Sequence, residues 1–161
     1  MTADRILSAI LARADAGARL AVILCTAAMV LVVAAQVVMR YAFNGSFDWA
    51  EEVSRIAFVW TIFLAIPLGI RDGTHVGIEL LVERFPRSVR RMLARFMAGL
   101  SALMMIVVFW TSVVVAGLTW SERLGALDMT SSVFFLPVIL GALHAALHLV
   151  HLALVPAEPA A

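Results

Sequence analysis

Residues 20–39, LAVILCTAAMVLVVAAQVVM, form a run of twenty residues without a charged side chain. An α-helix rises about 1.5 Å per residue, so this run reaches about 30 Å, the thickness of the hydrocarbon core of a bilayer. Every backbone amide and carbonyl must be paired inside lipid, and a helix pairs them within its own segment. The run therefore predicts a transmembrane helix.

Three further apolar runs follow, at residues 56–70, 96–120 and 129–155. The first of them is too short to cross unless its helix begins near Asp48, where Asp48-Trp49-Ala50-Glu51 resembles a capping box. The next helix is expected to run from Pro86 to about Arg123. We predict an all-α membrane protein in one membrane domain, residues 1–161, with four long, tilted transmembrane helices at about 18–40, 48–70, 94–121 and 130–155.

Composition supports a membrane protein and excludes a sizeable soluble domain. Hydrophobic residues make up 63% of the 161 residues, and the mean hydropathy is +1.01. Two shorter segments, residues 4–16 and 74–85, have apolar residues at helical spacing and predict short helices at the cytoplasmic interface. In the first of them Asp15 is expected to point away from the apolar face, and Gly17 to provide a bend before the first span.

The basic residues predict the orientation. All twelve are Arg, and nine lie before the first span or between the second and third, against three on the other side. By the positive-inside rule, both termini and the loop at residues 71–95 are cytoplasmic. This distribution also explains the arginines without nucleic-acid binding, so no nucleic-acid partner is expected.

The start of the second helix carries charges at the membrane edge. Glu51 and Arg55 are four residues apart and can pair, and Glu51 and Glu52 lie near the positive end of the helix dipole. Two interpretations stay open: a solvated helix start, or a polar joint against a neighbouring subunit. In the last helix, Gly141 and Ala145 form a small-xxx-small pair that permits close helix approach.

The middles of the spans exclude several functions. A self-contained carrier or proton-coupled exporter needs charges inside the membrane or broken helices around a central site, and neither occurs here. His144, His148 and His151 share one helix face, but neighbours on one helix cannot ligate both sides of a haem iron. A small metal site with His75 is geometrically possible, although an amphipathic helix end is the simpler explanation. We therefore expect no catalytic residue, no cofactor and no metal.

Short motifs around the second span resemble a known family. They are Arg40-Tyr41-Ala42-Phe43-Asn44, Trp49-Ala50-Glu51-Glu52-Val53-Ser54-Arg55, Phe58-Val59-Trp60 and His75-Val76-Gly77-Ile78-Glu79. With the four-span layout, they make the chain similar to the small membrane subunit (DctQ-like) of tripartite ATP-independent periplasmic (TRAP) transporters. Glu79 departs slightly from the pattern, in which Asp is commoner.

The resemblance implies a non-catalytic permease subunit in the bacterial inner membrane. Its partners would be a large membrane subunit (DctM-like) and a periplasmic substrate-binding protein (DctP-like). The large subunit would transport an organic acid in a sodium-coupled process. The small subunit would serve as a static scaffold within the lipid bilayer. The residues expected to contact the partner or stabilise the joint are Arg40, Trp49, Glu51, Glu52, Arg55, Trp60 and His75. The alternative function is a membrane anchor subunit of a redox enzyme.

Overall fold

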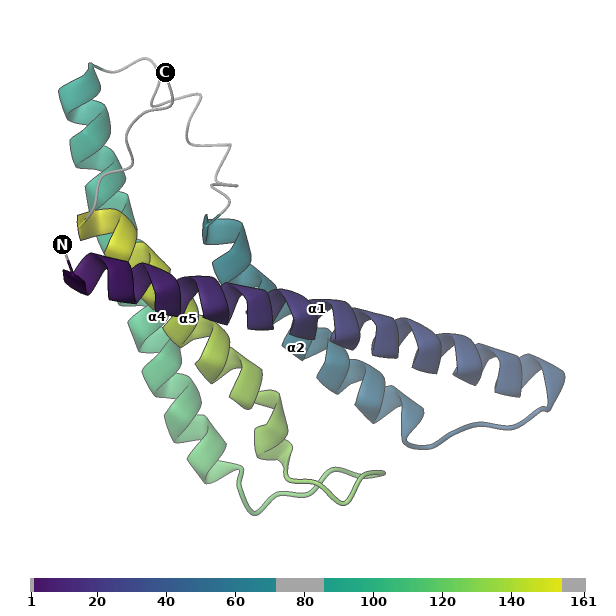
Figure 1. The fold of residues 1–161 in the computed structure, drawn as a ribbon. Coiled ribbons are helices and arrows are strands. Elements are labelled where there is room, and N and C mark those ends of the chain that lie inside the picture. Colours follow the sequence, from purple (N-terminus) through teal and green to yellow (C-terminus); the bar gives the residue numbers. More distant parts are fainter. Residues whose placement is uncertain (1, 72–85, 155–161) are drawn as a thin grey trace.

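The computed structural model describes residues 2–71 and 86–154. In these residues the chain forms four long helices, α1 (Thr2–Ala42), α2 (Ala50–Arg71), α4 (Arg87–Leu118) and α5 (Leu136–Leu154). A short 3-10 helix, η1 (Ser131–Phe134), precedes α5 (Figure 1). Each long helix contains a segment that is long and apolar enough to cross a membrane. The predicted all-α fold with four spanning helices is confirmed.

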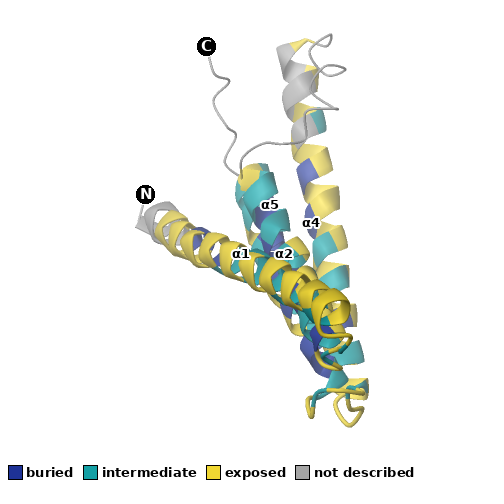
Figure 2. Ribbon diagram, turned by 90° about the vertical axis from the view of Figure 1, so that its right-hand side faces the viewer, coloured by how far each residue is buried: buried dark blue, intermediate teal, exposed yellow. Residues whose placement is uncertain are grey.

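The helices pack as a row rather than as a closed bundle. The main interfaces join α1 to α2, α2 to α5, and α5 to α4, while α1 and α5 touch over a short stretch (Figure 1). Each end helix of such a row has a neighbour mainly on one side. Both end helices accordingly have long exposed stretches (Figure 2). Large apolar side chains are exposed there, among them Leu31 of α1 and Met104 and Trp110 of α4.

Small residues allow α5 to pack closely in the middle of the row. Ala142, Ala145 and Ala146 are almost completely buried. A Cβ atom added to Gly141 would lie 2.2 Å from the carbonyl oxygen of Phe63 on α2. The backbones of α2 and α5 therefore meet at Gly141, as the small-residue pattern predicts.

The first helix is longer than expected, because α1 continues through Gly17. Its 41 residues reach about 62 Å, and the break expected at Gly17 does not occur. The expectation for Asp15 is also wrong, because this residue lies on the same helix face as Leu11 and Ala18 and is buried like them. That residues 4–16 lie at the membrane interface stays a prediction, and residues 74–85 lie outside the described residues.

Two other helix ends differ from the expected ones. Helix α2 begins at Ala50, two residues after the expected start, and continues through the buried Pro67. Helix α4 ends at Leu118 rather than near Arg123, and its C-cap Thr119 has left the helical dihedral angles, with φ −92° and ψ 8°. The backbone N–H and the hydroxyl of Thr119 both donate to the Val115 carbonyl. With 32 residues α4 is about 48 Å long.

Candidate functional site: the Glu52 joint and the exposed helix ends

Glu52 joins the start of α2 to the loop at residues 119–130, which connects α4 to η1. Its Oε1 accepts a hydrogen bond from the Ala126 amide at 2.9 Å, and its Oε2 accepts one from the Leu127 amide at 2.8 Å. The carboxylate thus satisfies two backbone donors more than seventy residues further along the chain. Gly125 lies against it, since a Cβ there would be 3.3 Å from Oε1. We call this contact the Glu52 joint.

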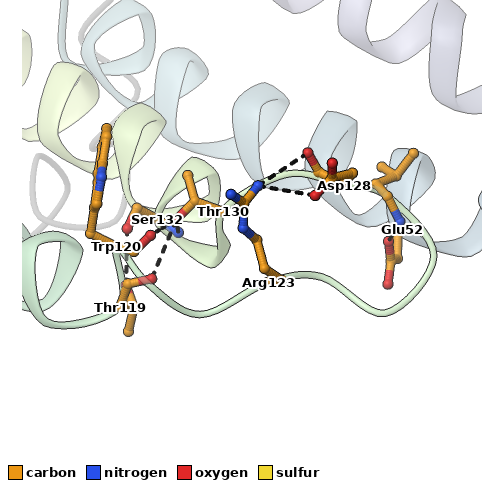
Figure 3. A network of polar contacts seen from close by, with 8 residues as sticks. Glu52, Thr119, Trp120, Arg123, Asp128, Thr130 and Ser132 are labelled. Carbon is orange, nitrogen blue, oxygen red and sulfur yellow. Dashed lines mark hydrogen bonds and ion pairs between the residues drawn. The ribbon is translucent and has the colours of Figure 1, made fainter.

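The loop that Glu52 holds is itself ordered by short polar contacts (Figure 3). Arg123 donates to the Asp128 carboxylate at 3.1 Å, and the Thr130 hydroxyl donates to the Trp120 carbonyl at 2.7 Å. Ser132, which is almost fully buried, donates through its hydroxyl to the Ala116 carbonyl at 2.6 Å. The two sides of the loop are also joined through the backbone, where the Leu124 N–H donates to the Met129 carbonyl and the Ser131 N–H donates to the Glu122 carbonyl.

The predicted pair between Glu51 and Arg55 is confirmed, because the Arg55 guanidinium donates to the Glu51 carboxylate one helical turn away on α2. Their side chains are 80% and 59% exposed, so the pair contributes little to folding and its charges face outward. The N–H of Phe47 donates to the Gln36 side chain at 2.9 Å, which ties the segment before α2 to the last turns of α1. The start of α2 is therefore fixed from two sides.

The other predicted site residues are more scattered. Arg40 is exposed in the last turn of α1, and Trp49 is 42% exposed with its ring against that of Phe47. Trp60 is half-buried and lies halfway along α2. His75 lies outside the described residues. The structure thus brings Glu51, Glu52 and Arg55 together, and their role in binding a partner stays a prediction.

A second polar cluster, which was not predicted from the sequence, lies at the opposite end of α2 from Glu52. Asp15 of α1 contacts His144 and His148 of α5, with its Oδ1 2.9 Å and 2.8 Å from their Nε2 atoms. Arg71, at the end of α2, contacts Oδ2 at 3.2 Å. The available signal was the helical spacing of Asp15 with Leu11 and Ala18, which places Asp15 on the packed face.

Together, the fold and these contacts define a multi-pass helical membrane protein. The family described as "Tripartite ATP-independent periplasmic transporters, DctQ component" matches residues 29–157, which is most of the chain and begins within the first span. The chain belongs to this family of TRAP transporter small permease subunits.

Several relatives agree with this membership. A Haemophilus influenzae protein named as a TRAP transporter small permease is 27% identical over 121 residues, covering 74% of this chain and 73% of the relative. The C4-dicarboxylate TRAP transporter small permease protein DctQ of Vibrio cholerae is 33% identical over 67 residues, 42% of this chain and 29% of the relative. The sialic acid TRAP transporter permease protein SiaT of H. influenzae is 30% identical over 60 residues, 37% of this chain and 10% of the relative.

Proposed function

We propose that this small permease subunit is the static scaffold of a TRAP transporter in the bacterial inner membrane. A large membrane subunit would carry out sodium-coupled uptake of an organic acid, which a periplasmic binding protein delivers. The small share of SiaT that the match covers supports a large partner, because a homologous segment there belongs to a much longer permease protein. Both termini of this chain would face the cytoplasm, as the arginine distribution indicates.

The main support for this proposal is that the four helices of this TRAP small permease subunit pack as an open row and not as a closed bundle. A row leaves broad apolar faces that lipid or another membrane protein must cover, and α1 and α4 expose many of the large apolar side chains. Near both ends of α2, the polar groups around Glu52 and Asp15 mostly bond to other groups of this chain. Such a subunit is suited to support a neighbour rather than to conduct a solute by itself.

The exposed charges at the outer end would set the position of the partner. Arg40, Glu51 and Arg55 lie at the end of α1 and the beginning of α2, and all three are exposed. The Glu52 joint fixes the loop at residues 119–130 against the start of α2, so the exposed charges lie on an ordered surface. Trp49 is at the same end, where an indole suits the membrane boundary.

Reconstitution of the complete system tests this function. The large subunit and this chain are inserted together into liposomes, with the binding protein outside, and uptake of labelled organic acids is followed under a sodium gradient. We expect uptake with all three components, and none when this chain is omitted or is present alone. Full uptake without this chain would contradict the scaffold function, and accumulation by this chain alone would make it the carrier.

A further inference from the structure

The cluster at the crossing of α1 and α5 combines a carboxylate with two imidazoles. His144 and His148 are one helical turn apart on α5, and both side chains are 11% exposed. Asp15, whose side chain is 4% exposed, reaches them from α1. The three donor atoms all lie within 4.8 Å of one another. Two helices far apart in sequence therefore present three convergent ligand atoms.

The hydrogen bonding of this cluster is incomplete. His148 Nε2 and Asp15 Oδ1 form a hydrogen bond at 2.8 Å. His144 Nε2 lies 2.9 Å from the same oxygen, but the angle between the two groups does not fit a hydrogen bond. This buried nitrogen has no other hydrogen-bond partner among the described residues. A buried polar atom without a partner destabilises the fold, because it has lost its hydrogen bonds to water. A cation between the three atoms would use the lone pairs of both imidazoles and the carboxylate.

We propose that Asp15, His144 and His148 bind one divalent transition-metal ion of the zinc class. Two imidazoles and one carboxylate are a ligand set that zinc prefers, at about 2.0–2.2 Å from the metal. Donor atoms around a tetrahedral ion are then about 3.4 Å apart. The separations of Asp15 Oδ1 from the two imidazole nitrogens, 2.8 and 2.9 Å, need only a small expansion, and all three ligand atoms lie within 4.8 Å of one another.

The surroundings complete the site. Arg71 contacts Oδ2 of Asp15 at 3.2 Å, which leaves Oδ1 for the metal and orients the carboxylate. A pocket of about 330 Å³, whose lining includes Asp15, Arg71 and His148, opens beside the cluster and offers an entry path and room for a water as fourth ligand. The ion would fasten α1 to α5, which otherwise touch only over a short stretch.

Cobalt binding tests the ligand set directly. The full chain, purified in detergent with a tag that contains no histidine and stripped with a chelator, is titrated with Co²⁺. We expect visible absorption of four-coordinate Co²⁺ at one ion per chain, lost when Zn²⁺ is added. Asp15→Asn and His144→Gln should each weaken binding at least about ten-fold. His151→Gln removes an imidazole from the same helix outside the cluster and should bind as the wild type does.

A second measurement separates lost binding from lost folding. Zn²⁺ should raise the melting temperature of the wild type, because an ion that binds only the folded chain stabilises it. The His144→Gln variant should keep the helical circular dichroism of the wild type and show no rise. Equal Co²⁺ absorption in the wild type and both ligand variants would overturn the site, as would its absence from the wild type. A loss in His151→Gln as large as in His144→Gln would overturn the ligand set.

Discussion

Replacing Gly141 by alanine should separate α2 from α5. The new Cβ would lie 2.2 Å from the Phe63 carbonyl oxygen and 2.8 Å from its carbonyl carbon. Both are backbone atoms, so no side chain can rotate to make room, and one helix must move by about 1 Å. Overpacking of this kind costs about 1–3 kcal/mol.

Gly99→Ala is the matched control for this change. Gly99 is also inside a helix, but a Cβ there would meet nothing within 4 Å. The gain in helix propensity from glycine to alanine is similar at both positions and cancels in the comparison. The difference in unfolding free energy between the two variants therefore measures the overpacking itself, about 1–3 kcal/mol.

Unfolding of the detergent-solubilised chain by sodium dodecyl sulfate, followed by circular dichroism, measures this difference. We expect Gly141→Ala to unfold at a lower detergent fraction than the wild type, and Gly99→Ala at the same or a higher one. A cysteine pair across α2 and α5 near Phe63 should also cross-link more slowly in Gly141→Ala. Equal unfolding midpoints for the two alanine variants would refute the close backbone contact.

Three further predictions concern the start of α2 and the orientation of the chain in the membrane. In Glu52→Gln one of the two accepting oxygens becomes a donor, so one amide of the loop loses its partner and should exchange hydrogen faster by mass spectrometry; unchanged exchange would contradict the Glu52 joint. Arg55→Ala breaks an exposed pair, so the melting temperature should hardly change while co-purification with the large subunit falls; co-purification at full yield would remove Arg55 from the proposed interface. For orientation, a membrane-impermeant thiol reagent applied to intact spheroplasts should label Ser121→Cys and leave Ser88→Cys unlabelled, and the reverse pattern would invert the proposed topology.

The four helices could be predicted because their signal is local. A run of apolar residues must lie in lipid or in a core wherever its neighbours are, and lipid requires a helix. The Glu51 and Arg55 pair was predictable for the same reason, since helix geometry alone brings residues four apart together. The close approach at Gly141 also follows from the order of small residues along one helix.

Contacts between distant segments could not be predicted in the same way. The partners of Glu52 are backbone amides of a loop, and backbone groups have no identity in the sequence. Asp15 and His148 are 133 residues apart, and which helix face meets which depends on the order of helices in the row. The position of Asp15 was missed because its charge suggested a solvated face, whereas the carboxylate has an arginine and two histidines around it.

The unbroken course of α1 has a mechanical consequence. Asp15 and Arg40 are 25 residues apart on one helix, about 37 Å along its axis. Because the helix is continuous, the position of its Arg40 end is coupled to the position of its Asp15 end. A partner contact that shifts the Arg40 end of α1 would strain the contacts of Asp15 with α5 and with Arg71. Stronger contacts at Asp15 would in turn restrict the movement of the Arg40 end.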